Sequence, residues 1–360
     1  MRIGIDGREL CGHPTGVGRY LMGLLTSWSR DSGGHELMLY VPQPVDLPID
    51  GRRIFTRTVS GGSGTWWEQV LLPAAAARDH LDVFFAPAYT TSLFHRIPTV
   101  LALHDLSFFA HPEWFTMRQG IRRRWFARES AGRARAIITI SQFSKREIVQ
   151  RLQLPADRVH VVPPGITSPI AGQSGGGRSQ ASRPNVLYVG SVFNRRHVPD
   201  LIRGFAPIAR AHSDARLDLV GDNRSHPFED IAAVIRREGL DGRAAWSAYV
   251  SDEELAKRYA AARAFAFLSE YEGLGLTPLE ALAAGIPPLL LDTPVARESC
   301  DRAALYVSLD NLREMTPALE TLLFDETRRG ELLAAAPEVL ARYNWTTAAR
   351  DTLRVIEASA

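Results

Sequence analysis

The sequence of 360 residues predicts an α/β protein with two doubly wound parallel sheets. Short runs of β-branched or aromatic residues alternate with helical stretches, which is the pattern of βαβ units. The length exceeds what one hydrophobic core usually covers, so we expect two domains of about 150 to 200 residues each. Hydrophobic residues make up 45% and charged residues 23% of the chain, a balance typical of a folded globular protein.

The first half of the chain contains seven short segments with the composition of strands. They are Arg2 to Asp6, Glu36 to Val41, Arg53 to Thr58, Val83 to Ala86, Thr99 to His104, Ala136 to Ile140 and His160 to Val162. These segments predict one parallel sheet in an N-terminal domain, residues 1–165.

A stretch rich in glycine and serine follows this domain and predicts a flexible linker over residues 166–184. Six further strand-like segments predict a second sheet in a C-terminal domain, residues 185–345. They are Val186 to Gly190, Leu217 to Gly221, Ala245 to Val250, Ala264 to Leu268, Pro288 to Leu291 and Ala304 to Val307.

Cysteine spacing, the N-terminal residues and the length of apolar runs argue against disulfide-rich, zinc-binding, exported and membrane-spanning proteins. Cys11 and Cys300 have no C-x-x-C pattern or Cys/His cluster around them, so we expect neither a disulfide framework nor a zinc site. The N-terminus lacks the features of an export signal, and no apolar run approaches the roughly 20 residues that span a bilayer. We therefore expect a cytoplasmic protein, without a nucleic-acid partner, in which any membrane contact is peripheral.

The strongest chemical signal follows the segment Ala264 to Leu268 and is Glu-Gly-Leu-Gly-Leu-Thr-Pro-Leu-Glu over residues 272–280. Ligands of doubly wound sheets bind at the carboxyl ends of the strands. Gly273 and Gly275 let backbone amides approach a ligand closely, and the helix start at Thr277 favours a phosphate through its free N–H groups and dipole.

Carboxylates stand at both ends of this segment. Glu272 can accept hydrogen bonds from sugar hydroxyls, and Glu280 can reach a ribose diol from about one turn into the helix. The alternative is two solvated glutamates beside an ordinary βα loop. Arg195 and Arg196 follow another predicted strand, and both can pair with a diphosphate; the alternative there is a solvated basic loop.

These segments resemble those of a known enzyme family. Residues 272–280 closely resemble the E-x7-E signature of the family-4 retaining glycosyltransferases, and residues 187–197 are similar to the phosphate-binding loop of that family. In the second segment, Asn194 replaces the usual proline, Arg196 the lysine and His197 the asparagine. The resemblance covers nearly the whole chain and includes His-Asp-Leu-Ser-Phe and His-Pro-Glu-Trp-Phe, which lie within residues 104–115.

The resemblance implies the GT-B fold, in which two Rossmann-like domains face each other across a cleft and a last helix, here 346–360, packs back on the first domain. The catalytic residues that it implies are His104, Asp105, Glu272, Arg195 and Arg196. The donor-binding residues that it implies are Gly16, Gly18, Arg195, Arg196, Val250, Glu272, Gly273, Leu274, Gly275, Leu276, Thr277 and Glu280.

The N-terminal residues of this set allow other interpretations. His104 can bind the transferred sugar and Asp105 can orient the acceptor hydroxyl or act as a base, but a buried structural pair is the alternative. Gly16 and Gly18, in the segment that begins at Thr15, would lie against the donor phosphate, whereas the bare pattern is that of a turn. Ser144 with Glu147, and Ser251 with Glu254, have the spacing of helix capping boxes.

Aromatic and basic residues mark the acceptor side. Trp66, Trp67 and Trp114 can stack on an acceptor sugar, although core packing is an equal alternative for the paired tryptophans. The stretch from Arg118 to Arg135 alternates arginines with apolar residues, so it can face anionic lipid or a lipid-diphosphate acceptor, or it is a plain solvated helix.

We expect an enzyme that moves a hexose, first of all mannose from GDP-mannose, from a nucleotide sugar to a glycan or polyprenyl-diphosphate-linked acceptor. No metal cofactor is expected, because no Asp-x-Asp triplet is present and arginines with helix amides can hold the diphosphate. The alternatives are a sugar-nucleotide 2-epimerase of the same architecture and a non-catalytic protein that binds nucleotide sugars.

Overall fold

The computed structural model of the chain describes residues 1–12, 16–49, 53–170 and 183–360. It divides into two compact units, one made of Met1–Gly165 with Tyr343–Ala360 and the other of Ile166–Arg342. The start of the predicted glycine loop at Thr15 and most of the predicted linker, 171–182, lie outside the described residues.

The N-terminal unit contains, within the described residues, a seven-stranded sheet in the order β3-β2-β1-β4-β5-β6-β7. Every strand pair is parallel, and the central strands β4, β5 and β6 are buried throughout, as expected for a sheet covered on both faces. The strands are β1 (Arg2–Asp6), β2 (Glu36–Val41), β3 (Ile54–Thr58), β4 (Val83–Ala86), β5 (Thr99–Ala102), β6 (Ala136–Thr139) and β7 (Val159–Val161).

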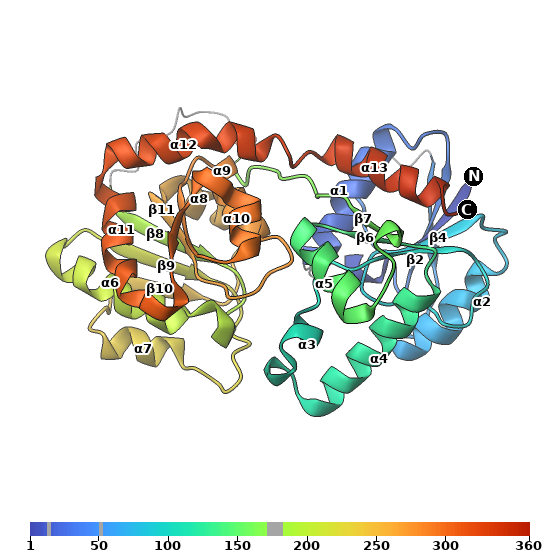
Figure 1. Cartoon of the computed structure of the whole chain (residues 1–360), viewed down its shortest axis with the longest axis horizontal. Helices are drawn as coiled ribbons and strands as arrows, with labels where there is room; N and C mark the ends of the chain where they lie inside the picture. Colours follow the sequence, from blue (N-terminus) through green and yellow to red (C-terminus); the bar gives the residue numbers. More distant parts are fainter. Residues whose placement is uncertain (13–15, 50–52, 171–182) are drawn as a thin grey trace. The chain divides into compact units, whose positions relative to one another are not determined.

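Helices connect these strands (Figure 1). A π-helical turn, η2 (Trp67–Leu71), and a 3-10 turn, η1 (Arg8–Leu10), lie in the loops. The α-helices of this part of the chain are α1 (Gly16–Arg30), α2 (Leu72–Ala76), α3 (Ser107–Ala110), α4 (Met117–Arg133) and α5 (Gln142–Leu152).

The C-terminal unit contains a six-stranded parallel sheet in the order β10-β9-β8-β11-β12-β13 within the part that the structure describes. Its strands are β8 (Asn185–Val189), β9 (Arg216–Val220), β10 (Ala244–Ser247), β11 (Ala264–Phe267), β12 (Pro288–Leu291) and β13 (Leu305–Val307). Its helices are α6 (Val198–Ala211), α7 (Ile231–Arg237), α8 (Asp252–Ala261), α9 (Leu276–Ala283), α10 (Pro294–Cys300), α11 (Met315–Phe324) and α12 (Glu326–Leu340).

The last helix, α13 (Trp345–Glu357), packs against α1 in the N-terminal unit. The Trp345 side chain lies so close to two glycines that a Cβ built on Gly23 or Gly165 would come within 2.5 Å of it. Trp28 also donates a hydrogen bond from Nε1 to the carbonyl oxygen of Ala349 at 3.0 Å. The two glycines therefore make room for the aromatic ring that anchors this helix.

Two predicted strand ends and one predicted helix cap need a correction larger than the one-residue shifts at other strand ends. The strand that begins at Thr99 ends at Ala102, so His104 lies beyond it, and the strand predicted to reach Val250 ends at Ser247. Ser144 does not cap its helix, because Ser141 does so by accepting a hydrogen bond from the Ser144 amide at 3.0 Å.

Each sheet reverses its winding direction at one pair of neighbouring strands. The pair is β1 and β4 in the N-terminal sheet, and β8 and β11 in the C-terminal sheet. Ligands of doubly wound folds bind just beyond the carboxyl ends of the strands at such a switch point. The loops that follow these four strands are therefore where the functional side chains are expected.

Candidate functional site

The loops after β8 and β11 meet at the switch point of the C-terminal sheet. Arg196, at the end of the 3-10 turn η5 (Asn194–Arg196), forms an ion pair with Glu272 from the loop after β11. Oε1 of Glu272 accepts a hydrogen bond from Nε of Arg196 at 2.9 Å and lies 2.7 Å from Nη2 in the same ion pair. The contact joins residues 76 positions apart, and it joins two of the predicted site residues.

The Arg196 guanidinium is held on several sides. Its Nη1 donates to the carbonyl oxygen of Ser191 at 2.9 Å, and its Cζ lies 4.8 Å from the centre of the Phe267 ring. Burial alone would lower the pKa of Arg196, but the charges and hydrogen bonds of Glu272 and Tyr188 together outweigh it and the pKa is raised. Arg196 is therefore a fixed cation.

Glu272 has a second donor from its own loop. The Ser269 hydroxyl donates to the same Oε1 atom at 2.8 Å, and Ser269 is itself buried. The carboxylate is thus oriented before any ligand is present, which lowers the entropic cost of binding one.

The neighbours of Arg196 in η5 also reach the loop after β11. The Cζ atom of Arg195 lies 4.1 Å from the centre of the Phe193 ring, and its carbonyl oxygen accepts a hydrogen bond from the Glu270 amide at 3.0 Å. His197 contacts Glu270 through Nε2 at 2.8 Å and Asp200 through Nδ1 at 3.1 Å. The hydrogen bond with Asp200 is the main reason why the pKa of His197 is raised.

The predicted glycine turn is present over residues 273–275. Gly275 has a φ of +90°, which an L side chain rarely adopts, and it is the N-cap of α9. The helix therefore begins at Leu276, and the predicted start residues Thr277 and Pro278 lie inside its first turn. A hollow of about 270 Å³, open to solvent, is bordered by this turn and by the start of α10.

Glu280 and Val250 are both linked to α8. Oε2 of Glu280 accepts a hydrogen bond from the Tyr259 hydroxyl at 3.4 Å, which links α9 to α8. Val250 is half-buried and precedes Ser251, whose side chain caps α8 by accepting from the Glu254 amide at 3.2 Å. The predicted capping box at Ser251 is confirmed in this contact.

Comparisons with known proteins agree with this geometry. The model of the family "Glycosyltransferase Family 4" matches residues 14–168, and the model "Glycosyl transferases group 1" matches residues 176–334. This chain belongs to the family-4 glycosyltransferases.

Curated relatives of this glycosyltransferase are also sugar transferases. The chain is 25% identical over 289 residues to the O-antigen chain mannosyltransferase B of Escherichia coli, covering 78% of this chain and 75% of that protein. It is 25% identical over 292 residues to the alpha-D-kanosaminyltransferase of Streptomyces kanamyceticus, covering 76% and 75% of the two chains.

Solved structures identify the fold as GT-B. The Anabaena protein HepE in complex with UDP-glucose matches with a TM-score of 0.75 at 18% identity, over 99% of this chain and 100% of that one. The sucrose-phosphate synthase of Thermosynechococcus elongatus matches with a TM-score of 0.78 at 17% identity, over 99% and 98% of the two chains.

The predicted catalytic residues His104 and Asp105 of the glycosyltransferase form hydrogen bonds to other residues and not to each other. The buried His104 donates from Nε2 to the Pro87 carbonyl at 2.8 Å, and burial lowers the pKa of His104, so the ring is neutral with Nδ1 as its acceptor. Oδ2 of Asp105 accepts from the Tyr89 hydroxyl at 2.8 Å and Oδ1 from the Ser107 amide at 2.8 Å.

The predicted aromatic residues differ in exposure. Trp67 is fully buried and donates from Nε1 to the Val59 carbonyl at 2.6 Å, so it is a core residue and cannot stack on an acceptor. Trp66 is 65% exposed, and the half-buried Trp114 stacks on His111 with ring centres 3.8 Å apart.

Gly16 and Gly18 lie in the first turn of α1, where Gly18 is buried and Gly16 is exposed. Among the residues that the structure describes, no group of three or more His, Cys, Asp or Glu side chains is placed to hold a metal ion. No helix in the same described ranges is long and apolar enough to cross a membrane.

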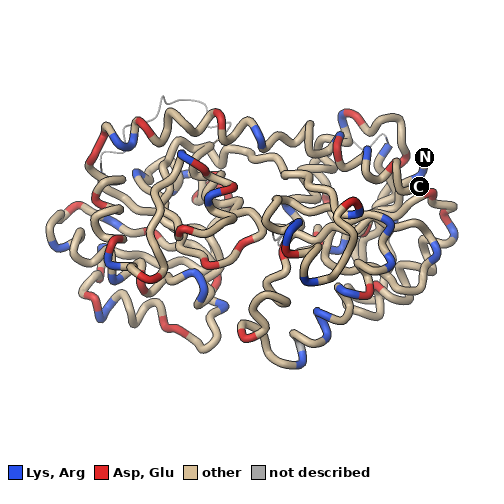
Figure 2. The backbone as a smooth tube through the Cα atoms, in the orientation of Figure 1, with Lys and Arg blue, Asp and Glu red and all other residues tan. Residues whose placement is uncertain are grey.

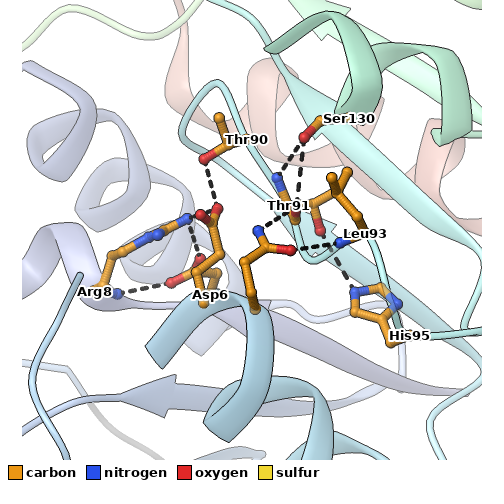
Figure 3. A network of polar contacts seen from close by, with 9 residues as sticks. Asp6, Arg8, Thr90, Thr91, Leu93, His95 and Ser130 are labelled. Atoms are coloured by element: carbon orange, nitrogen blue, oxygen red, sulfur yellow. Dashed lines mark hydrogen bonds and ion pairs between the residues drawn. The ribbon is translucent and has the colours of Figure 1, made fainter. Parts of the chain in front are cut away.

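A polar network that the sequence did not single out lies at the switch point of the N-terminal sheet (Figure 3). Asp6 ends β1, and Arg8, two residues later, is held between Asp6 and Glu68 of η2. The available signal was the pair of charges at the end of β1, since ligands of doubly wound sheets bind near the carboxyl ends of strands. Recognising it required the strand order, which a single sequence does not give.

Proposed function

We propose that this glycosyltransferase transfers a hexose, with retention of anomeric configuration, from a nucleotide diphosphate sugar to a glycan or lipid-linked acceptor. GDP-mannose is the proposed donor. The mannosyltransferase relative in Escherichia coli supports the choice of sugar, and the UDP-glucose complex of HepE supports a nucleotide sugar as the ligand class.

The proposal rests chiefly on the meeting of Arg196 and Glu272 at the switch point of the C-terminal sheet. Arg196 supplies a cation, and Glu272 supplies a carboxylate that accepts hydrogen bonds, at the carboxyl ends of adjacent strands. The cation suits the diphosphate and the carboxylate suits the sugar, which are the groups on the two sides of the bond that breaks. Glu272 accepts hydrogen bonds from sugar hydroxyls, and the arginines face the diphosphate. Because Glu272 occupies two nitrogens of Arg196, we assign the main phosphate contact to Arg195.

The bond changes balance without a further reagent. The bond between the anomeric carbon and the diphosphate oxygen breaks, and a bond forms from the same face to the acceptor hydroxyl oxygen. The hydroxyl proton passes to the departing diphosphate, whose growing negative charge Arg195 and Arg196 stabilise. No metal ion is needed in this scheme, because the two guanidinium groups and the amides at the start of α9 supply the positive charge.

The remaining predicted residues take the donor and acceptor roles that the family resemblance assigns to them. Glu280 binds the ribose hydroxyls and Val250 contacts the base through its backbone. In the N-terminal unit, the neutral His104 accepts a hydrogen bond from the transferred sugar at Nδ1, and Asp105 orients the acceptor hydroxyl.

A thermal-shift panel of GDP, UDP and dTDP sugars tests the donor. A ligand at about 100 times its dissociation constant adds about 2.7 kcal/mol to the free energy of unfolding, so the true donor stands out. GDP-mannose is expected to give the largest shift, and a shift with a UDP or dTDP sugar alone would overturn the choice of donor. Glu280→Ala is expected to abolish transfer in the same preparation, and unaltered transfer would contradict the site assignment.

We also propose that α4 contacts an anionic membrane surface. Met117, Ile121 and Trp125, spaced four residues apart, are 80%, 55% and 52% exposed and share one face of the helix. Arg118 and Arg122 are exposed beside them, and basic residues recur along the helix (Figure 2). An apolar stripe flanked by cations is the surface that interfacial helices present to anionic lipid.

Sedimentation with vesicles tests the membrane contact. Binding is expected with vesicles that contain phosphatidylglycerol and not with pure phosphatidylcholine, and Ile121→Glu with Trp125→Glu is expected to remove it. Trp66→Glu is the matched control, because it places the same charge at another exposed tryptophan of the N-terminal unit. Equal binding to both kinds of vesicle, or equal loss in the control, would contradict the proposal.

A further inference from the structure

The N-terminal sheet has its own switch point, between β1 and β4, and charged side chains meet there. Nη2 of Arg8 forms an ion pair with Oδ2 of Asp6 at 2.9 Å and donates a hydrogen bond to Oε1 of Glu68 at 2.5 Å. Its backbone amide donates to Oδ1 of Asp6 at 3.1 Å. Thr90, in the loop after β4, donates its hydroxyl to the same oxygen of Glu68 at 2.5 Å.

The π-helical turn η2 is what brings Glu68 to this point. Trp67, Glu68 and Gln69 are consecutive and all buried, which the wider π turn permits more readily than an α turn. Gln69 accepts from the Leu93 amide at 2.9 Å and donates to the Thr91 carbonyl at 3.2 Å. The turn therefore fixes the loops after both switch-point strands.

Arg8 keeps hydrogen-bonding capacity that this network does not use. Both carboxylates bind the same nitrogen, Nη2, while Nε is buried and has no partner. Within the described part of the chain, no acceptor binds Nη1 either, and the side chain is 11% exposed. A largely covered arginine with unused donors at a switch point indicates that a ligand completes its hydrogen bonds.

The charge of the cluster selects the kind of ligand. Burial raises the pKa of Asp6 to about 6 against the attraction of Arg8, so its carboxyl is mostly ionised at pH 7. The charge and hydrogen bond of Arg8 lower the pKa of Glu68, although burial opposes them. Two carboxylates and one guanidinium leave a net charge of about −1, which repels a phosphate. A hydroxyl group fits, because it can accept from Arg8 and donate to a carboxylate.

We propose that Arg8 binds a hydroxyl group of an uncharged sugar residue of the acceptor, and that Glu68 is the positioning residue that presents it. This inference rests on the proposed function, since it names the acceptor class of the same transfer. It assigns the acceptor contact to the switch point of the N-terminal sheet, with Asp6 and Thr90 completing the cluster around the guanidinium.

The probes are the methyl α-glycosides of mannose, rhamnose, glucose, galactose and N-acetylglucosamine, titrated into the full-length protein by ligand-observed NMR. At least one glycoside is expected to bind, and pyrophosphate is not expected to displace it from this site. Arg8→Lys keeps the charge but loses the planar fork, and it is expected to weaken the binding about tenfold or more.

Two further variants separate recognition from folding. Arg8→Gln with Glu68→Gln removes both charges together, so no unpaired buried charge remains if Arg8→Lys fails to fold. Arg57→Gln is the matched control, because Arg57 pairs with Asp79 in the same unit away from the cluster. The control is expected to bind the glycoside as the unaltered protein does.

In the transfer assay, both cluster variants are expected to raise the KM for the acceptor at least tenfold, with kcat and the KM for the donor within about twofold. An unchanged acceptor KM in folded variants, displacement of the glycoside by pyrophosphate, or no glycoside binding to the unaltered protein would overturn the inference. Failure of the proposed function would give a different result, because the unaltered protein would then neither bind nor consume any nucleotide sugar.

Discussion

Replacing Glu272 by alanine is expected to destabilise the C-terminal unit more than replacing Glu272 and Arg196 together. The single change leaves the Arg196 guanidinium, whose side chain is only 12% exposed, without its counter-charge. It also removes the shorter of the two acceptor contacts of the Ser269 hydroxyl, whose other acceptor is the Tyr271 carbonyl. Changing Arg196 to methionine in the same chain removes the cation that would otherwise be left unpaired.

The size of the effect follows from the contacts. Arg196 makes a charge-assisted hydrogen bond to Glu272 at 2.9 Å, a second ion-pair contact with it at 2.7 Å, and a hydrogen bond to the Ser191 carbonyl at 2.9 Å. Removing one partner of a buried ion pair costs about 3 to 5 kcal/mol. Glu272 is 21% exposed, so water screens part of the loss and we expect about 3 kcal/mol for Glu272→Ala. The double variant is expected to recover about 2 kcal/mol of this loss.

Native-state hydrogen exchange read by mass spectrometry provides the assay, because peptides from β8 and β11 report the opening of this unit separately from the other. Arg302→Ala is the matched control, since Arg302 pairs with Glu338 in the same unit and both are largely exposed. That control is expected to change stability by less than about 1 kcal/mol. A double variant as unstable as Glu272→Ala, or a loss below about 1 kcal/mol for Glu272→Ala, would refute the reasoning.

Three further predictions concern the same unit and the proposed reaction. Gly275→Ala is expected to lower the free energy of unfolding by about 1 to 2 kcal/mol, because Gly275 has a φ of +90°. Gly330→Ala, inside α12 with open space around it, is expected to raise that free energy by up to about 1 kcal/mol. Urea unfolding that shows changes of the same sign for both variants would contradict this. The raised pKa of His197, due chiefly to Asp200, means that its contribution to stability is full below pH 6.5 and is lost as the pH rises through the folded pKa. The thermal midpoint is therefore expected to fall less steeply with pH above pH 6.5 in His197→Gln than in the unaltered protein. An equal slope in the two proteins would contradict the raised pKa of His197. A chelator is expected to leave the transfer rate within about twofold, because arginines hold the diphosphate, and a tenfold loss restored by a divalent ion would contradict that part of the mechanism.

The sequence was sufficient to predict the sheets because their strands are short, β-branched and buried. Both halves show such runs, and the observed strands differ from the predicted ones only at their ends. Helix starts were harder to place where two candidates lie close together. Ser141 and Ser144 both have hydroxyls at the start of α5, and the amide that Ser141 accepts from is that of Ser144 itself.

Contacts between distant residues were beyond the sequence. The segment 272–280 was found from its own pattern, but the partnership of Glu272 with Arg196 depends on β8 and β11 being neighbours. The same holds for Arg8 and Glu68, which lie 60 positions apart and meet because the turn η2 lies against the loop after β1. A tryptophan can equally well be buried in a core or stack on a ligand, and its hydrophobicity does not distinguish the two. The fold shows that Trp67 is buried and Trp66 is exposed.

The most direct test of the account is the mass and anomeric configuration of the product formed from a nucleotide sugar and a glycan or lipid-linked acceptor. The expected product is an acceptor heavier by one hexosyl residue, joined with the anomeric configuration of the donor, and Glu272→Ala is expected to form none of it. Release of an epimerised free sugar, an inverted linkage, or full transfer by Glu272→Ala would contradict it.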